Sequence, residues 1–585
     1  MNRPEELKSL ILSQKPTDQQ REAIFADDSE FLLRASPGSG KTWTSCRRFL
    51  WRAENRNGPG GIALLSFTNT AIREFEAASV EIGRRQFLSD PNFVGTFDSF
   101  VERFIINTFG HIIPGTTKRP RLFPGERPGD WNNSRLIAWV SNNGRKLRIP
   151  AWLISPRIEA GNIVFDGSFG YGSLRVPTAE AYKTISQLLQ YGYYTHSHRA
   201  FWAVRILEDH PDIAQLLARR FPEILVDEAQ DTNIWLLQVL RYIRQAGSRV
   251  TLVGDPDQCI FAFSQASASS LEELRSEWGL KKKPLNQSFR CNDIIAKTVR
   301  NISDNTAFIG YGPPQNEQCR AYVIADSSDE YDDSLSFFRA KLKEADIQER
   351  NAAILCRGHE QLGKIRGELR FSSFKGKTKR LANIAFLRDV DGEYAKAYEK
   401  LVVLLRELCD APEVWDVLDE LPDSTQAQAI KLQLWRFIRS EHGLPSIDLS
   451  ATDWLTCVRE RLAALLSSVG VKSPVKLGHT IKKTGMDTKQ MTLPLFEQQA
   501  ADPAMRHETI HQVKGESIDA IMLIGSKPFY DKVVKAALSN SESEERRLAY
   551  VAMTRARHLV VVAVPQNHYA KQKAVWQEWG FDCHT

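Results

Sequence analysis

The chain has 585 residues, of which 42% are hydrophobic and 25% charged, and its formal net charge at pH 7 is +6. Such values are typical of a folded protein of several domains, since one domain takes about 100–200 residues. They argue against a membrane protein, because no apolar run approaches the roughly 20 residues of a transmembrane helix. The first residues, MNRPEELKS, also lack the apolar core of a signal peptide.

Eight cysteines are scattered along the chain without a C-x-x-C pair or the spacing of a zinc site. This usage is typical of a reducing compartment, so we expect a cytoplasmic protein with no membrane partner. The small positive charge is compatible with nucleic-acid binding but does not by itself indicate it.

The first chemical motif follows an apolar run at residues 31–33, which predicts a short buried strand. A glycine turn and the start of a helix come next. Backbone N–H groups in such a turn, the positive end of the helix dipole and the charge of Lys41 form a cradle for phosphate. Thr42 adds a hydroxyl where a phosphate-bound Mg²⁺ would lie. The residues expected to bind phosphate are Ser36, Pro37, Gly38, Ser39, Gly40, Lys41 and Thr42.

Further along, we expect strands at residues 62–67, 93–94, 223–228 and 249–253, with helices between them. Strands that alternate with helices favour a mostly parallel α/β sheet, and ligands of such sheets bind at the carboxyl ends of the strands. Asp227 and Glu228 would meet the phosphate cradle at this edge. One carboxylate would hold Mg²⁺ through its water shell, and the other would orient and deprotonate the attacking water.

The rest of the chain predicts two helical segments and a second α/β unit. Residues 134–220 are mostly helical in pattern, and the second unit begins near Lys281. Its candidate strands are residues 320–324, 353–356, 520–524 and 559–564. Between about 376 and 501 the pattern changes to long helices, which look inserted into this second unit.

Nine motifs, in order, make the chain resemble a superfamily 1 DNA helicase of the UvrD/Rep/PcrA family. The early motifs are residues 16–24, 35–44, 65–71 and 94–100. The central ones are residues 224–233 (ILVDEAQDTN), 250–263 (VTLVGDPDQCIFAF) and 284–290 (PLNQSFR). The last two are residues 509–520 (TIHQVKGESIDA) and 544–557 (EERRLAYVAMTRAR). Any one of them is a weak signal, but nine in the family's order are specific.

This resemblance implies an α/β fold with two RecA-like P-loop motor domains, each carrying a mainly helical insertion. The first motor domain would take residues 1–100 and 215–280, with residues 101–214 as its insertion. The second would take residues 281–375 and 502–568, with residues 376–501 inserted and residues 569–585 left as a C-terminal tail. ATP would bind with Mg²⁺ between the motor domains and drive 3′→5′ movement on single-stranded DNA, with unwinding of 3′-tailed duplexes.

The resemblance also assigns roles to individual residues. The catalytic group would be Lys41, Asp227, Glu228, Gln258, Arg290 and Arg555. Thr42 and Asp227 would serve Mg²⁺, and Gln258 would sense the γ-phosphate. Arg290 and Arg555, from the second motor domain, would act as arginine fingers on the charge that develops in the transition state.

On the base side of the nucleotide, Gln20 would contact the adenine edge. Trp43 stands where the family usually has arginine, and Phe289 where an aromatic residue stacks on the other face of the base. We therefore expect a Trp43–Phe289 sandwich of the adenine, with core packing of Trp43 as the alternative. Glu516 is the candidate for binding the ribose, although the motif around it departs from that of the family.

Single-stranded DNA is expected to meet aromatic side chains, on which bases stack, and polar side chains that contact phosphates or sugars. The candidates are Phe67, Thr68, Asn69, Thr96, Phe97, Ser99, Phe261, Phe263 and His511. For each phenylalanine, packing in the core is the alternative.

Two other functions are open to this sequence. The nearer one is a DNA-sensing ATPase subunit with little unwinding of its own, which relays its state to a nuclease partner in a recombination or Gabija-like phage-defence complex. A P-loop kinase or GTPase is disfavoured by the paired arginines and by residues 250–263.

Overall fold

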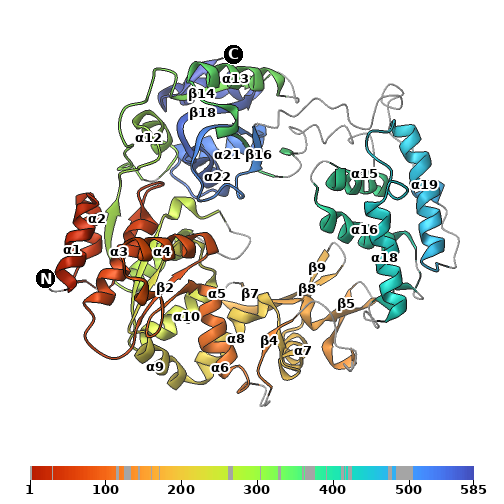
Figure 1. Cartoon of the computed structure of the whole chain (residues 1–585), viewed down its shortest axis with the longest axis horizontal. Coiled ribbons are helices and arrows are strands. Elements are labelled where there is room, and N and C mark those ends of the chain that lie inside the picture. The colour runs from red at the N-terminus through yellow and green to blue at the C-terminus, as the bar shows by residue number, and fades with distance from the viewer. Residues whose placement is uncertain are drawn as a thin grey trace. The chain divides into compact units, whose positions relative to one another are not determined.

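The computed structural model describes residues 3–28, 30–113, 118–123, 133–142, 145–159, 161–169, 172–260, 268–303, 305–326, 331–358, 361–362, 376–389, 392–409, 411, 414–415, 417–418, 424–471, 477–481 and 505–584. The chain forms two compact units, one of residues 1–123, 132–357 and 508–585, and one of residues 124–131 and 358–507 (Figure 1). All eight cysteines are free. Within the described ranges, no helix combines the length and apolarity that a membrane span requires.

The larger unit contains two sheets, and the first has the strand order β13-β1-β12-β11-β2-β3. These strands are β1 (Phe31–Ala35), β2 (Ile62–Ser66), β3 (Phe93–Thr96), β11 (Glu223–Val226), β12 (Arg249–Gly254) and β13 (Lys281–Leu285). Every neighbouring pair is parallel, which confirms the predicted sheet and brings all carboxyl ends to one edge. Helices α3 (Lys41–Glu54) and α4 (Asn69–Glu81) pack on one face, and α10 (Ile234–Gln245) packs on the other.

The prediction that Lys281 starts the second α/β unit is wrong, because β13 pairs with β1 along its whole length. Three lysines and a proline make this strand read as a polar linker. As an edge strand, β13 keeps its lysines in contact with neighbours: Lys283 Nζ donates to Glu22 Oε1 at 2.5 Å, and Lys281 pairs with Asp28 at 3.4 Å. Charged side chains on an edge strand also protect the sheet from pairing with another chain.

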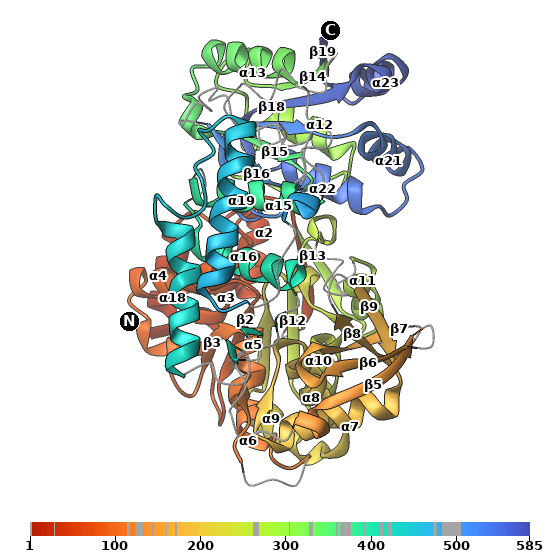
Figure 2. The same cartoon turned by 90° about the vertical axis from the view of Figure 1, so that its right-hand side faces the viewer.

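The second sheet of the larger unit has the order β16-β15-β17-β18-β14-β19 (Figure 2). Its strands are β14 (Ala321–Asp326), β15 (Ala352–Cys356), β16 (Arg506–Thr509), β17 (Ile518–Ile524), β18 (Ala556–Pro565) and β19 (Asp582–His584). The four predicted strands of the second unit are therefore confirmed. Helices α12 (Asp293–Arg300), α21 (Lys527–Leu538), α22 (Glu544–Met553) and α23 (Gln566–Glu578) share an apolar core with this sheet.

Residues 569–585 were predicted to be a tail, but their described part, residues 569–584, packs against the second sheet and adds a strand to it. The helix α23 runs through most of this segment, and β19 pairs in parallel with β14. Trp576 is fully buried and packs edge-to-face against Phe581, with ring centroids 5.0 Å apart. The helix is otherwise mostly polar, and the buried Trp576 and Trp579 stand together at its end, so the sequence pattern concealed this packing.

The first insertion is not mainly helical, as was predicted. Its described part contains the antiparallel pair β5 (Ile137–Asn142) and β6 (Arg145–Pro150), and the antiparallel sheet of β7 (Ile154–Glu159), β8 (Asn162–Phe169) and β9 (Gly172–Val176). Helices follow these strands: α7 (Thr178–Gln190), α8 (His196–Asp209) and α9 (Pro211–Arg220). The helical expectation therefore holds only for the second half of the segment.

The insertion is anchored to the first sheet through α8. The buried His198 ring contacts the Ile154 carbonyl of β7 through Nε2 at 2.7 Å, and burial lowers the pKa of His198 to about 4. The neighbouring Arg199 pairs with Asp98 Oδ2 at 2.5 Å, on α5 (Phe97–Val101). The strands of the insertion are thus tied to the helix that follows β3.

The second compact unit is helical in its described part, as was predicted for residues 376–501. It contains α15 (Gly376–Asp389), α16 (Tyr394–Leu408), α18 (Thr425–Arg439), α19 (Ala451–Ser468) and α20 (Leu477–Thr480) around one apolar core. The buried Trp454 indole donates to the Pro445 carbonyl at 3.1 Å, so its polar atom is satisfied.

Candidate active site

The loop between β1 and α3 turns through two glycines with left-handed backbone, Gly38 (φ 71°) and Gly40 (φ 77°). Neither tolerates a side chain: a Cβ on Gly38 would lie 2.6 Å from Arg290 Cβ, and one on Gly40 would lie 2.9 Å from Gln20 Nε2. The loop therefore packs closely against residues from elsewhere in the chain. It leads into α3 at Lys41, so the helix N-terminus and the lysine charge face the same place.

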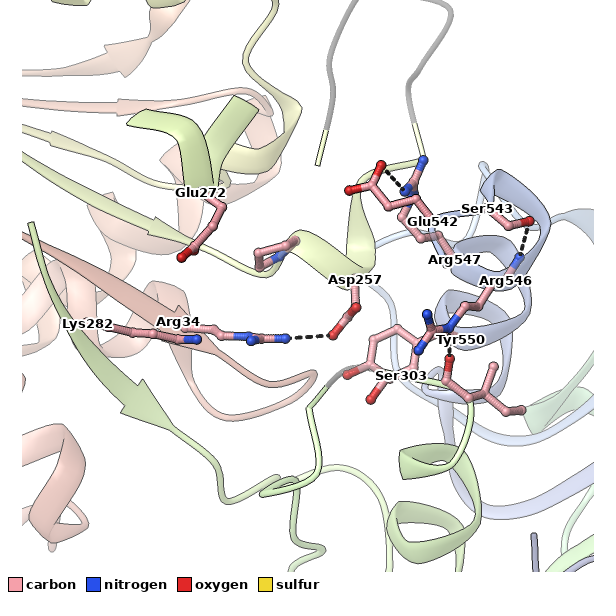
Figure 3. A pocket seen from close by; sticks show the side chains of 12 residues that line it. Arg34, Asp257, Glu272, Lys282, Ser303, Glu542, Ser543, Arg546, Arg547 and Tyr550 are labelled. Atoms are coloured by element: carbon pink, nitrogen blue, oxygen red, sulfur yellow. Dashed lines mark hydrogen bonds and ion pairs between the residues drawn. The ribbon is translucent and has the colours of Figure 1, made fainter. Parts of the chain in front are cut away.

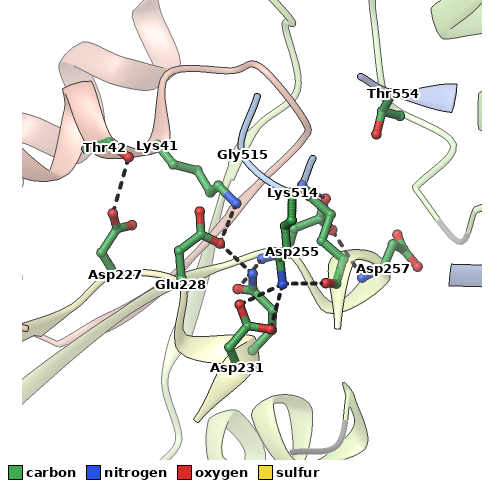
Figure 4. Close-up of polar contacts among 12 residues, drawn as sticks. Lys41, Thr42, Asp227, Glu228, Asp231, Asp255, Asp257, Lys514, Gly515 and Thr554 are labelled. Atoms are coloured by element: carbon green, nitrogen blue, oxygen red, sulfur yellow. Dashed lines mark hydrogen bonds and ion pairs between the residues drawn. The ribbon is translucent and has the colours of Figure 1, made fainter. Parts of the chain in front are cut away.

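Lys41 and Thr42 meet the two carboxylates that follow β11 (Figure 4). Lys41 Nζ lies 2.9 Å from Glu228 Oε2, and Thr42 Oγ1 donates to Asp227 Oδ2 at 3.3 Å. Gln230 Nε2 also donates to Glu228 Oε2 at 2.5 Å. The structure thus brings together the four residues predicted to lie at this edge.

The two carboxylates differ in protonation because their partners differ. Burial raises the pKa of Asp227 to about 7, and the charge of Glu228 adds to this effect. Burial alone would raise the pKa of Glu228 as well, but Lys41 and Lys514 outweigh it and hold that pKa at about 2. Burial would lower the pKa of Lys41, but the nearby carboxylates raise it above its usual value. Glu228 and Lys41 therefore form a charged pair.

The oxygens around Asp227 fit a divalent cation. Asp227 Oδ1 is buried and has no hydrogen-bond partner among the residues that the structure describes, and the Thr42 hydroxyl lies at the other carboxylate oxygen. Carboxylate and hydroxyl oxygens are the ligands that Mg²⁺ prefers, usually with several waters and substrate phosphates completing its shell. Among the other described residues, no cluster of three or more His, Cys, Asp or Glu side chains is arranged to hold a metal.

Gln258, after β12, links the two sheets of the larger unit. Its amide nitrogen donates to Asp255 Oδ2 at 2.7 Å, and its oxygen accepts from Arg555 Nη2 at 3.2 Å. Burial raises the pKa of Asp255 to about 6, and burial lowers the pKa of Arg555 to about 9. Arg555 still carries a proton at neutral pH.

Arg290 and Arg555 come from the second half of the chain and are held by backbone groups. Arg290 donates to the carbonyls of Thr554 at 3.1 Å and Gly515 at 3.2 Å, and Arg555 Nε donates to the carbonyl of Val551 at 3.0 Å. Arg290 adjoins the phosphate loop, because the neighbouring Phe289 donates its N–H to the Gly38 carbonyl at 2.7 Å. Neither arginine has a carboxylate partner among the described residues, so both charges are available to an anion.

Lys514 was not predicted as a site residue, yet its ammonium group joins the two sheets through three contacts (Figure 4). Its Nζ lies 2.7 and 2.6 Å from the two Asp231 carboxylate oxygens and 2.9 Å from the Gln258 carbonyl. Burial raises the pKa of Asp231 to about 6, although Lys514 acts to lower it. Lys514 and Asp231 both lie within motifs recognised in the sequence, but nothing in either motif indicated that the two residues would pair.

The residues predicted for the base lie around the phosphate loop. Gln20 closes the capping box of α2 (Asp18–Phe25) with Thr17, and its Nε2 donates to the Ser39 carbonyl at 3.1 Å. Trp43 is half-buried against the core, and the Arg47 guanidinium lies 4.1 Å from its ring centroid. Phe289 is 54% exposed and free to stack on a ligand. Glu516 is half-buried, and its carbonyl accepts from Arg555 Nη1 at 3.4 Å.

Some residues predicted to bind DNA have structural roles instead. Phe97 is only 1% exposed and belongs to the core, so the prediction that it stacks on a base is wrong in this conformation. Thr68 caps α4 by accepting from the Ala71 N–H, and Thr96 caps α5 by accepting from the Ser99 N–H. Ser99 Oγ in turn donates to the Thr96 carbonyl at 2.7 Å.

The other predicted DNA contacts have mixed outcomes. Phe67 is half-buried and Asn69 is exposed, both directly after β2. His511 Nε2 contacts the Ile260 carbonyl at 3.3 Å, which joins the two sheets beside Lys514. Phe261 and Phe263 lie outside the described residues.

A polar cavity of about 260 Å³ lies near this seam (Figure 3). Arg34 and Asp257 form an ion pair on one side, at 3.1 Å, and α22 supplies Arg546 and Arg547 on the other. The Tyr550 hydroxyl is buried there, and no described residue hydrogen-bonds to it. Most of the charged groups that line the cavity are paired with one another, so the cavity offers less unpaired charge to a ligand than the phosphate loop does.

Two RecA-like sheets, a phosphate loop and paired carboxylates are the features of P-loop nucleoside triphosphatases, and the chain is one of this class. A family model described as the UvrD/REP helicase N-terminal domain matches residues 16–135 and 174–278. A second, described as the UvrD-like helicase C-terminal domain, matches residues 488–567. The chain belongs to the UvrD/Rep family of superfamily 1 helicases.

Individual relatives agree with this assignment. The chain is 27% identical over 384 residues to the "ATP-dependent DNA helicase UvrD1" of Mycobacterium leprae, and the match covers 57% of this chain and 48% of that protein. It is 25% identical to "DNA helicase II" of Escherichia coli over 49% of this chain and 40% of that protein. A match to "DNA helicase II" of Haemophilus influenzae, at 22% identity, covers 95% of this chain and 85% of the other. The chain thus spans about half, or less, of the length of the more similar relatives.

Proposed function

We propose that this chain is an ATP-driven, Mg²⁺-assisted motor that moves 3′→5′ along single-stranded DNA and unwinds 3′-tailed duplexes. The observation that supports this most is the division of one site between two lobes. Lys41 and Glu228 follow strands of the first sheet, whereas Arg290 and Arg555 are held by residues that flank strands of the second. The names of two relatives, both of which contain the words DNA helicase, agree with the proposal.

Lys41 exchanges partners when ATP binds. Without nucleotide, its ammonium group is paired with Glu228 at 2.9 Å. A triphosphate on the loop, next to the N-terminus of α3, offers Lys41 a larger negative charge and draws it away from Glu228. Glu228 then loses the main cause of its low pKa, becomes a stronger base and can accept a proton from the attacking water. Lys41 in this way keeps the base inactive until substrate is present.

Thr42 and Asp227 would hold Mg²⁺, which when bound neutralises phosphate charge and orients the β- and γ-phosphates. Because burial raises the pKa of Asp227 to about 7, binding of a cation at this site displaces a proton at neutral pH and below. Metal affinity therefore rises with pH up to that range.

Arg290 and Arg555 act on the charge that develops during phosphoryl transfer. Both are held by backbone carbonyls, so their side chains need little reordering when the γ-phosphate arrives. Gln258 already contacts Arg555, and this contact lets one residue of the first lobe report the γ-phosphate to the second. Hydrolysis and phosphate release remove the anion that holds the lobes together.

DNA would lie along the carboxyl edge of the first sheet. Phe67 offers a half-buried ring for stacking, and Asn69 an exposed amide for phosphate or sugar contacts. His511 and Lys514 join the lobes next to the catalytic residues, so movement of the second lobe is coupled to hydrolysis.

For the base, we propose stacking between Phe289 and Trp43, with the Gln20 amide at its edge. Phe289→Ala and Trp43→Ala should each raise the KM for ATP several-fold with a smaller change in kcat. Trp51→Ala is the matched control for Trp43, since Trp51 lies on the same helix and packs edge-to-face on Phe25 at 5.0 Å. An unchanged KM in Phe289→Ala would remove that residue from the base site.

The function itself is tested by the ATPase rate with and without single-stranded DNA, and by strand displacement on 3′-tailed and 5′-tailed duplexes. We expect DNA to stimulate the wild type, Lys41→Ala to lose stimulated turnover, and only the 3′-tailed duplex to be unwound. Stimulated hydrolysis without displacement of either duplex would instead support the DNA-sensing subunit with a nuclease partner.

A further inference from the structure

The antiparallel ribbon of β5 and β6 has one buried face and one open face. In its register Ala138 lies opposite Ile149, and Trp139 lies opposite Arg148. Ala138 and Ile149 are fully buried in the core of the larger unit, while Trp139 is 52% exposed and Arg148 is exposed. The alternation of a strand therefore aims Trp139 and Arg148 away from the protein.

Trp139 and Arg148 contact each other across the ribbon. The guanidinium carbon of Arg148 lies 5.7 Å from the Trp139 ring centroid. Within the described part of the chain, Arg148 makes no ion pair and the Trp139 indole N–H has no hydrogen-bond partner. A large aromatic ring and the guanidinium on the adjacent β-strand are thus exposed side by side, where a ligand could contact both.

The surrounding sequence is strongly cationic. Residues 131–158 contain five basic side chains and not one Asp or Glu. The basic residues are Arg135, Arg145, Lys146, Arg148 and Arg157. The neighbouring sheet differs: Arg175 on β9 pairs with Glu159 at 2.7 Å and with Asp166 at 3.2 Å. Arg157, on β7, is also paired, with Asp166 at 2.9 Å, so positive charge is neutralised on the sheet of β7, β8 and β9. On the ribbon, Arg148 makes no ion pair with any residue that the structure describes.

We propose that the open face of the β5–β6 ribbon binds single-stranded nucleic acid, with a base stacked on Trp139 and a phosphate paired with Arg148. Aromatic platforms beside cations are the combination that grips unpaired strands, since every base has a face to stack and every nucleotide a phosphate to neutralise. A duplex shields its base faces and would use Arg148 but not Trp139. This inference rests on the proposed function and adds a contact surface that lies in the insertion.

The buried face keeps the ribbon in place for this role. A Cβ on Gly167 of β8 would lie 2.7 Å from Ile149 Cγ2, so β6 packs directly on the sheet of β7, β8 and β9. That sheet is fixed in turn by the contact of His198 with Ile154. A nucleic-acid strand bound at Trp139 is thereby connected, through α8 and the Arg199–Asp98 pair, to the end of β3.

The test measures binding of the full-length protein to a fluorescent oligothymidine and to a blunt duplex, at several salt concentrations without nucleotide. The variants are Trp139→Ala, Trp139→Phe, Arg148→Ala and, as the matched control, Arg175→Ala. Arg175→Ala removes the same charge from the same insertion, but a charge that is already paired. Thermal unfolding shows that each variant is folded.

We expect Trp139→Ala to raise the Kd for single strands about fivefold to a hundredfold. Trp139→Phe should keep most of the wild-type affinity. Arg148→Ala should reduce the slope of log K against log salt by about 0.7, and Arg175→Ala should leave it unchanged. Wild-type binding that Trp139→Ala does not weaken, or weakens only for the duplex, would overturn this inference and leave the proposed function intact. A wild type that binds no oligonucleotide would overturn both.

Discussion

Replacement of Lys514 by methionine should loosen the seam between the two lobes without nucleotide. Lys514 Nζ donates to both oxygens of Asp231 and to the Gln258 carbonyl, at 2.6 to 2.9 Å. The side chains of Lys514 and Asp231 are only 12% and 7% exposed. The variant leaves Asp231 buried beside Glu228 without a compensating charge, and it leaves one carbonyl without its donor.

The size of the effect follows from that burial. Removal of one partner from a buried ion pair costs about 3–5 kcal/mol. Because the pair joins two lobes that each have their own core, the cost should appear as opening of the seam. A loss of about 3 kcal/mol increases the open population roughly a hundredfold. In the variant the pKa of Asp231 should rise further above 6, so its defect should be smaller at pH 5.5 than at pH 7.5.

Native-state hydrogen exchange measures this opening at the amides of Gln258 and Cys259, which donate to Asp255 and Pro256 carbonyls next to the seam. Lys514→Met should accelerate their exchange about a hundredfold, and the double variant Lys514→Met/Asp231→Asn should recover most of the protection. Lys532→Met is the matched control, since Lys532 pairs with Glu545 at 2.9 Å from a 61% exposed position. Equal exchange in Lys514→Met and the wild type would refute the reasoning.

Three further predictions concern stability and binding. Asp227→Asn should abolish ATP hydrolysis but stabilise the metal-free protein by about 2–4 kcal/mol at pH 7.5. The reason is that folding raises the pKa of Asp227 from 3.8 to about 7 and so disfavours its charged form. That gain should shrink at pH 5.5, where Asp227 is protonated, and a gain independent of pH in chemical denaturation would contradict it. Gly167→Ala should cost about 1–3 kcal/mol by overpacking against Ile149, with partial rescue by Ile149→Ala; an unchanged denaturation midpoint would count against this packing. Phe289→Ala should weaken binding of a fluorescent ATP analogue about tenfold, whereas Ile309→Ala, at a neighbouring position exposed to a similar degree, should not.

Much of the active site could be predicted because its signals are local. The phosphate loop needs a strand, a glycine turn and a helix start within about a dozen residues, and these stand together before Lys41. Asp227 and Glu228 directly follow an apolar run, so the sequence placed them at the end of a strand. Lys514 escaped notice because its partner, Asp231, is 283 positions away, and only packing of the two lobes brings them together.

The fold could be predicted less well where strands are short or polar. The ribbon residues 146–149 alternate basic and apolar side chains, a period of two that indicates a strand, but the helices after residue 177 dominate the pattern of that region. Three of the five residues of β13 are lysines, because an edge strand needs no continuous apolar face. Phe97 follows a strand in the expected place, yet the packing of α5 on the core turns its ring inward.

The most direct test of the two-lobed site is single-turnover ATP hydrolysis in the presence of single-stranded DNA, with ATP binding measured separately. Arg290→Ala and Arg555→Ala should bind ATP but hydrolyse it about 10³–10⁵-fold more slowly than the wild type. Arg557→Ala, whose side chain is 51% exposed and lies 3.7 Å from Asp519, is the matched control and should keep the wild-type rate. Rates within tenfold of the wild type in both Arg290→Ala and Arg555→Ala would contradict the account.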